Sequence, residues 1–187
     1  MFSKITMTFI FILTLTFSLR AQEREEINKH TVSHEVSVEV ESSIEEVYEY
    51  ITDSDMPVEI IKRHGVVHGP VSSELIDGQW NNVGDKKRLT FSDKNTSIEE
   101  ILVLDDPNYH AYKVYDFSNP LLNPLLKEIK GEWFLRELEN GKTLVSWKYT
   151  FNARNWRSKQ VLRVLIFLQF NTFMSNVMPR LKAKLEN

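Results

Sequence analysis

Apolar and polar residues alternate along much of the chain, and this pattern predicts a sheet-rich protein. The clearest example follows the turn at Asn140-Gly141, where four bulky residues alternate with polar ones: Val145, Trp147, Tyr149 and Phe151. Successive side chains of a strand point to opposite faces of the sheet, so these four groups share one face. Similar patterns, bounded by turn residues, predict strands at residues 33–41, 66–76, 86–91, 96–104, 109–117, 131–138 and 142–151.

A helical spacing of apolar residues replaces the alternation in three places. Ser43 is a candidate N-cap, and Glu46 completes a capping box that accompanies four apolar residues at helical spacing, namely Ile44, Val47, Tyr48 and Ile51. Pro57 suits the first turn of a second short helix. The last segment, about residues 157–185, is the longest helical pattern, and Pro179 is expected to kink or break it near its end.

The order of these elements predicts an α+β fold. A strand is followed by two short helices, a run of antiparallel strands and one long helix, with no internal repeat. A sheet and a helix that each carry one apolar face bury those faces against each other. We therefore expect a curved antiparallel sheet wrapped around the C-terminal helix, with residues 33–187 forming a single domain.

The N-terminus differs from the rest of the chain. A short basic start precedes an apolar run at residues 5–19, and Ala21 follows ahead of a polar stretch. Residues 1–21 are therefore typical of a secretory signal peptide cleaved after Ala21, which predicts a periplasmic or secreted protein. The alternative is an uncleaved membrane anchor, because Leu19 is larger than the residues usually found three positions before such a cut. Residues 22–32 are polar and charged, and we interpret them as a tether.

Composition narrows the classes of function. The chain has 187 residues, of which 42% are hydrophobic, and a net charge of −3 that argues against nucleic-acid binding. The absence of cysteine excludes disulfides, thiolate metal ligands and cysteine nucleophiles. His64 and His68 are four residues apart, but glycines interrupt any helix that would align them, and no clustered acid completes a metal site. No P-loop or dinucleotide motif occurs, so we expect no metal and no cofactor.

Three stretches and the terminal helix together resemble a known superfamily. The stretches are VSVEVESSIEEVYEYITD (36–53), WNNVGDKKRLTFSDKNTSIEEILVLDDP (80–107) and GEWFLRELENGKTLVSWKYTF (131–151). Their order and spacing resemble the helix-grip fold of the START and birch-pollen-allergen superfamily (SRPBCC), and most closely its bacterial polyketide cyclase/dehydrase and lipid-transport-like group. The resemblance implies an apolar ligand held between sheet and helix, but it does not imply one particular chemistry.

The hairpin around Asn140-Gly141 suggests which residues share a face. A two-residue turn opposes Phe134 to Trp147 and places Glu132 and Arg136 on the same side. If that side meets the long helix, a carboxylate and a guanidinium lie in or beside an apolar space, where they pair together or bind a polar ligand head. A one-residue bulge would instead turn both charged groups out to solvent.

A second hairpin raises the same question for Glu100. A two-residue turn at residues 94–95 places Phe91 and Glu100 on one inward face. This turn has no glycine to fix its geometry, so we prefer a surface position for Glu100. Glu132, Arg136 and Glu100 are thus weak nominees for acid–base catalysis, and we assign no residue a catalytic role.

The aromatic residues of the strands and of the last helix predict a cavity. Ordinary core packing explains an apolar helix face in most proteins, but a wall rich in aromatic and Met residues also suits an adaptable pocket. Given the helix-grip resemblance, we prefer a ligand cavity to a filled core. Its expected lining residues are Phe91, Phe134, Arg136, Trp147, Tyr149, Phe167, Phe170 and Met174.

Trp156 lies among basic residues at the start of the last helix, and Arg157 follows it directly. A tryptophan with cationic neighbours suits a membrane interface, where the ring lies among lipid headgroups. A solvated helix start is the alternative and the one we prefer, although basic charge at a helix N-terminus is mildly unfavourable.

The leading hypothesis is an exported, non-catalytic protein that binds a hydrophobic, lipid-like small molecule. One alternative is an enzyme similar to polyketide cyclases or dehydratases, which would need an acid–base pair in the cavity. Another is a module that docks on a membrane or a protein partner through Trp156 and Arg157. The sequence leaves the oligomeric state open.

Overall fold

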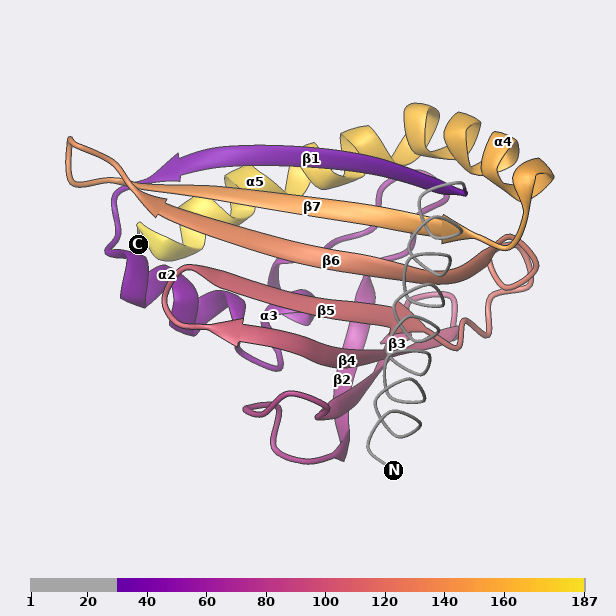
Figure 1. The fold of residues 1–187 in the computed structure, drawn as a ribbon, viewed down its shortest axis with the longest axis horizontal. Helices are drawn as coiled ribbons and strands as arrows, with labels where there is room; N and C mark the ends of the chain where they lie inside the picture. Colours follow the sequence, from indigo (N-terminus) through magenta and orange to yellow (C-terminus); the bar gives the residue numbers. More distant parts are fainter. Residues whose placement is uncertain (1–29, 187) are drawn as a thin grey trace, which may run out of the picture.

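Seven antiparallel strands form one curved sheet in the computed structural model, which describes residues 30–186 (Figure 1). The strands are β1 (Thr31–Val40), β2 (Pro70–Asp77), β3 (Lys86–Phe91), β4 (Thr96–Asp105), β5 (Tyr109–Tyr115), β6 (Leu126–Glu137) and β7 (Thr143–Ala153). Their order across the sheet is β1-β7-β6-β5-β4-β3-β2. Consecutive strands from β2 to β7 are therefore neighbours, and the first strand pairs with the last.

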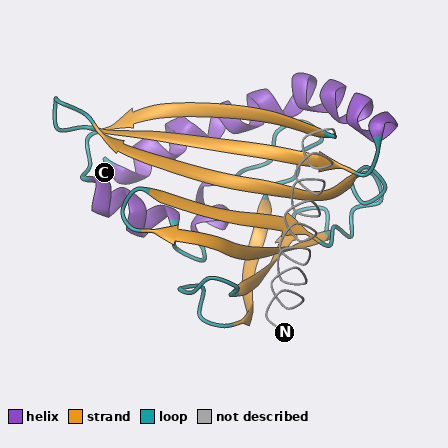
Figure 2. Cartoon of the chain, in the orientation of Figure 1, coloured by secondary structure: helices purple, strands orange, loops and turns teal. Residues whose placement is uncertain are grey.

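Helices cover one face of this sheet (Figure 2). The chain passes from β1 into two short helices, α2 (Ile44–Ile51) and α3 (Met56–Ile60). After β7, three segments join into one long helix: α4 (Trp156–Leu165), the π-helical turn η1 (Ile166–Phe170) and α5 (Asn171–Leu185). This helix starts at one end of the sheet and crosses its inner face to end near α2 (Figure 1). The predicted helix-grip arrangement is confirmed.

Side-chain caps begin two of these helices. Ser43 and Glu46 form the predicted capping box, because Glu46 N donates to Ser43 Oγ at 3.3 Å and Ser43 N donates to Glu46 Oε2 at 3.1 Å. At the start of α4, Ser158 N donates to Asn155 Oδ1 at 3.0 Å. Each cap satisfies backbone N–H groups that have no partner within the first helical turn.

Of the predicted kink or break at Pro179, the break does not occur. The helix continues through Pro179 to Leu185. A proline leaves the carbonyl four residues earlier without its usual donor. Here Ser175 and Pro179 both lie on the exposed side of α5, so water can satisfy that carbonyl. The irregular part of the helix lies earlier, at η1, which has no proline.

The N-terminal boundary differs slightly from the prediction. β1 begins at Thr31, two residues inside the segment interpreted as a tether. The predicted signal peptide and most of the tether lie outside the described residues. All members of the buried core lie between Val40 and Leu181, so a chain that begins at Gln22 keeps the whole described fold.

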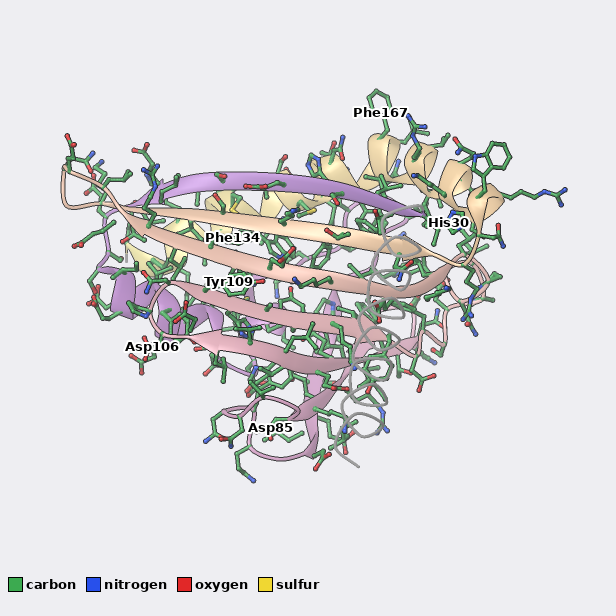
Figure 3. All side chains as sticks on the ribbon, in the orientation of Figure 1. His30, Asp85, Asp106, Tyr109, Phe134 and Phe167 are labelled. Carbon is green, nitrogen blue, oxygen red and sulfur yellow. The ribbon has the colours of Figure 1, made fainter. Side chains whose placement is uncertain are left out.

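The hairpin between β6 and β7 has a different register from the predicted one. Its loop contains three residues, because Leu138 N donates to Lys142 O at 2.8 Å and Gly141 has a positive φ of 75°. Trp133 therefore opposes Trp147, whereas Phe134 opposes Ser146. A shift of one residue moves every side chain of a strand to the other face. Phe134 lies on the outer face beside Tyr109, with ring centroids 4.9 Å apart (Figure 3).

The hairpin between β3 and β4 has the same kind of loop. Phe91 N donates to Asn95 O at 2.8 Å, and Lys94 has a positive φ of 68°. Lys87 consequently opposes Glu99, and Leu89 opposes Ser97. The inward-facing acid of β4 is therefore Glu99, and the preferred surface position of Glu100 agrees with the structure.

One end of the space between sheet and helix is a filled core. The rings of Trp133 and Trp147 stack there with centroids 5.0 Å apart and planes 4° from parallel. Met174, Val177 and Leu181 of α5 are fully buried within the same core cluster. Trp133 and Trp147 thus pack against α5 as a solid interior at this end of the sheet.

Candidate functional site

A cavity of about 170 Å³ lies between the inner face of the sheet and the long helix. Its opening lies at two loops, because Val66 and Leu121 line the cavity and are 66% and 73% exposed. Most of its wall is apolar, with contributions from Ile61, Val67, Pro70, Leu89, Phe91, Val114, Phe117, Leu122, Ile129, Leu165, Phe170 and Phe173. The strands supply a rigid floor, and the helix with the two loops supplies the other walls.

Among the described residues, a buried ion pair places a carboxylate in the wall of the cavity. Glu99 lines the cavity, and its Oε2 lies 3.4 Å from Lys87 Nζ. Lys87 Nζ also donates to Ser54 O at 2.9 Å and lies 4.0 Å from the centroid of the Trp80 ring. Burial raises the pKa of the Glu99 carboxyl and lowers the pKa of the Lys87 ammonium, because each charged form loses its hydration.

The second oxygen of Glu99 remains available. Within residues 30–186, Oε2 is paired with Lys87, but no hydrogen-bond donor is present for Oε1. An O–H or N–H group of a ligand in the cavity would donate a hydrogen bond to this oxygen.

A chain of hydrogen bonds ends at Tyr149, which also lines the cavity. Trp147 Nε1 donates to the Tyr112 hydroxyl at 3.3 Å, and that hydroxyl donates to the Tyr149 hydroxyl at 3.2 Å. The Tyr149 oxygen thus already accepts one hydrogen bond, and its own O–H remains able to donate to another acceptor. Gly131 makes room for this arrangement, since a Cβ at that position would collide with the Tyr112 ring.

Polar groups around Asp93 surround the opening. Asp93 Oδ2 accepts hydrogen bonds from the side-chain amides of Asn95 at 2.7 Å and Asn119 at 3.3 Å. His68 Nε2 lies 3.9 Å from the same oxygen. These contacts hold the β3–β4 turn against both loops of the opening. Among the described residues, no three potential metal ligands form a group that could hold an ion.

Gln169 of η1 adds a polar group to the helical wall. Its Oε1 is buried and has no hydrogen-bond partner within the described part of the chain. The side-chain amide lies against Gly65, where a Cβ would collide with it. Gly65 also has a positive φ of 55°, a conformation that glycine adopts at little cost. The π-helical turn and the 61–70 loop therefore fit together at the edge of the cavity.

The predicted ligand-binding residues divide into three groups. Phe91, Tyr149 and Phe170 line the cavity. Trp147 and Met174 face the same interior but are fully buried in the filled core. The remaining predictions are wrong about position: Phe134, Arg136 and Phe167 are exposed and do not line the cavity.

The three weak nominees for catalysis also lie outside the cavity. Arg136 is exposed on the outer face of β6. Glu132 is on the same outer face, where it accepts a hydrogen bond from the Tyr109 hydroxyl at 2.8 Å and pairs with Lys130 at 2.7 Å. Glu100 pairs with Lys113 at 3.0 Å. The proposal of an acid–base pair formed by these residues is therefore wrong.

Sequence reasoning missed Lys87 and Glu99. A signal was present, because Lys87 precedes Leu89 and Phe91 at the strand spacing that places all three on one face. A three-residue loop then pairs Lys87 with Glu99. His68 and Asp93 are far apart in the sequence, and no local pattern joins them.

Solved structures with the same fold include plant and bacterial proteins. The ginseng major latex-like protein 151 from Panax ginseng has a TM-score of 0.63 and 17% identity over 84% of this chain and 99% of its own. The ZhuI aromatase/cyclase from Streptomyces sp. R1128 has a TM-score of 0.62 and 15% identity over 83% of this chain and 94% of its own. XoxI from Bacillus cereus has a TM-score of 0.59 and 20% identity over 82% of this chain and 95% of its own.

Sequence comparison identifies a family, whereas these structural similarities show only a shared fold. No curated protein matches the chain in sequence. The sequence profile of one family, described as polyketide cyclase/dehydrase and lipid transport, matches residues 31–186. This range includes every strand and helix that the structure describes. The chain therefore belongs to the polyketide cyclase/dehydrase and lipid-transport family.

Proposed function

We propose that the protein is an exported carrier that binds a small amphiphile in the cavity between sheet and helix. The observation that carries this proposal is an apolar cavity whose wall includes a buried carboxylate, Glu99, with an oxygen that no described residue satisfies. An apolar site with a few convergent polar groups is the usual form of a small-molecule site. The polar groups give the ligand one orientation, and the apolar wall gives most of the affinity.

The size of the cavity limits the ligand. An apolar cavity of about 150 Å³ holds one benzene-sized ring. The cavity of about 170 Å³ therefore suits one ring or a short alkyl segment, and a longer chain would extend through the opening between Val66 and Leu121. The polar end of the ligand is best matched by a hydroxyl, because Glu99 offers an acceptor and Tyr149 offers a donor.

Binding is favoured over catalysis by the state of the acidic groups. Acid–base catalysis needs a group that is free to exchange a proton with the substrate. Glu99 is paired with Lys87 through Oε2, and Asp93 accepts hydrogen bonds from Asn95 and Asn119 at the opening. The Streptomyces aromatase/cyclase shares the fold at 15% identity, which carries no catalytic residue over to this chain.

A matched pair of ligands tests the proposal. We expect residues 22–187 to bind 4-propylphenol at least about tenfold more tightly than 4-propylanisole, because only the phenol donates a hydrogen bond to Glu99. Isothermal titration calorimetry measures both dissociation constants. Native mass spectrometry of protein purified from its host, followed by organic extraction, identifies any natural ligand.

Two variants locate the binding site. Leu89→Trp should fill the cavity and abolish binding. Arg136→Gln, on the outer face of the sheet, should leave the dissociation constant unchanged. Equal affinity for the phenol and its methyl ether would contradict the role of Glu99. Binding that survives Leu89→Trp in a folded protein would place the ligand elsewhere and overturn the proposal.

Export belongs to the same proposal and rests on residues 1–21. The apolar run and Ala21 support cleavage before Gln22. Intact mass measurement of the protein from its host distinguishes the two forms. A mass that includes residues 1–21 would support the uncleaved anchor instead.

A further inference from the structure

The long helix has a second apolar face that the fold does not use. Five residues on the side of α4 and η1 away from the sheet are exposed by 46% to 74%, and we call them the outer face: Trp156, Val161, Val164, Phe167 and Leu168. Leu162, Ile166 and Phe170 already bury the opposite side of the same helix. A helix that covers a sheet needs one apolar side only. Figure 3 shows Phe167 projecting away from the body of the protein.

Basic residues border the outer face. Arg157 and Arg163 are exposed, and neither forms an ion pair with another residue in the range 30–186. The sequence has no Asp or Glu between Glu139 and Glu186, although the chain as a whole has a net charge of −3. The long helix is therefore a positively charged element of a negatively charged protein, and it complements an anionic surface.

The outer face adjoins the helical wall of the cavity. Leu165, three residues before Leu168 on the same helix, lines the cavity, and so do Gln169 and Phe170 of η1. Residues three apart on a helix are neighbours. A surface that contacts Phe167 and Leu168 would thus lie next to the helical wall of the ligand site.

The start of the described chain lies at the same end of the molecule. His30 O accepts a hydrogen bond from Ala153 N at 3.0 Å, three residues before α4 begins, and Figure 3 shows His30 near α4. The connecting residues 20–29 reach at most about 35 Å when extended. In the alternative in which residues 1–21 are not cleaved, an apolar segment at residues 5–19 inserted in a bilayer would hold the outer face close to that bilayer.

We propose that the outer face binds the surface of a membrane that contains anionic lipid. Trp156 and Phe167 would enter the headgroup region, while Arg157 and Arg163 would contact lipid phosphates. The helix from Trp156 to Leu185 is long and apolar enough to cross a bilayer, but its other side packs against the sheet, so it lies along the membrane surface. A second copy of the chain is a poorer partner, because paired outer faces would bring their arginines together.

Vesicle binding by residues 22–187 tests this proposal without the apolar segment. We expect binding to vesicles of phosphatidylcholine with phosphatidylglycerol and little binding to phosphatidylcholine alone, measured by cosedimentation. Arg157→Gln with Arg163→Gln should weaken binding about 25-fold, since each basic residue near an anionic membrane contributes about fivefold. Phe167→Ser with Leu168→Ser should weaken it at least about tenfold.

Matched control residues lie away from the long helix, either near the β2 edge of the sheet or on the side of the sheet that the helices do not cover. Val71→Ser with Val83→Ser removes two apolar residues that are 57% and 63% exposed. Arg88→Gln with Arg136→Gln removes two charges. Both control pairs should bind vesicles as the unchanged protein does.

Tryptophan fluorescence gives an independent readout. Trp156 is 64% exposed, whereas the other three tryptophans are at most 5% exposed. Binding through the outer face should shift its emission to the blue and protect it from acrylamide. The proposal is overturned if the controls weaken binding as much as the outer-face variants, or if no vesicle binds. It is also overturned if sedimentation shows a dimer that Phe167→Ser with Leu168→Ser dissociates. None of these results depends on whether the cavity binds a phenol.

Discussion

At the residue level, the buried Lys87–Glu99 pair should be costly to break and much less costly to replace as a whole. Glu99→Gln leaves the Lys87 ammonium buried without its counter-ion, so we expect the free energy of unfolding to fall by about 3 kcal/mol. Lys87→Met with Glu99→Gln removes the buried charge and should recover much of that loss. Urea unfolding of the single and double variants measures the coupling. A double variant less stable than Glu99→Gln alone would contradict this interpretation.

His110 should make stability depend on pH. Burial lowers its pKa from 6.5 to about 4, and the nearby Lys87 charge acts in the same direction, against the hydrogen bond to Val103 O. Below pH 6.5 the unfolded chain binds a proton that the folded chain does not, so stability falls as the pH falls toward about 4. The shift corresponds to at most about 3 kcal/mol.

The pH dependence can be assigned by substitution. His110→Leu should reduce the slope of unfolding free energy against pH between pH 6.5 and about 4. Carboxylates also titrate in this range, so the difference between the two proteins is the quantity to measure. Identical slopes in urea unfolding would show that His110 does not contribute.

At the level of elements, local pattern predicted the strands but not their pairing. The alternation in residues 142–151 identified β7 correctly, and the capping box of Ser43 and Glu46 identified α2, because both depend on neighbouring residues. Register depends on the loop, and a loop of three residues instead of two turned Phe134 outward and Glu99 inward. The cavity combines β3 to β7, two loops and η1, which no local pattern joins.

The two hairpin loops should respond in opposite ways to glycine substitution. Lys94 and Gly141 occupy equivalent positions, with φ values of 68° and 75°. A positive φ costs a lysine about 1 kcal/mol or more, and glycine avoids this strain. Glycine also loses more backbone entropy on folding, so Lys94→Gly should raise the free energy of unfolding by only roughly 0.5 kcal/mol. Gly141→Ala should lower it by about 1 kcal/mol. Thermal unfolding of both variants tests the assignment, and changes of the same sign would refute it.

For the whole molecule, the interior has two parts with separate roles. Trp133, Trp147 and Met174 fill the end toward the C-terminus of the long helix, and the cavity occupies the end toward β3 and β4. Stability and ligand preference should therefore be separable. Met174→Ala should lower the free energy of unfolding by about 3 kcal/mol and leave the dissociation constant of 4-propylphenol unchanged.

Phe91→Ala should have the converse effect, because Phe91 lines the cavity and is only partly buried. It removes less apolar contact, so we expect a loss of about 1 kcal/mol in stability. The enlarged cavity should shift the preferred ligand from 4-propylphenol toward 4-heptylphenol. Calorimetric titration of both phenols, with urea unfolding of the same samples, compares the two variants. If Met174→Ala changed the chain-length preference as strongly as Phe91→Ala does, the two ends would form one continuous ligand space, and the filled core could not be treated as a separate support.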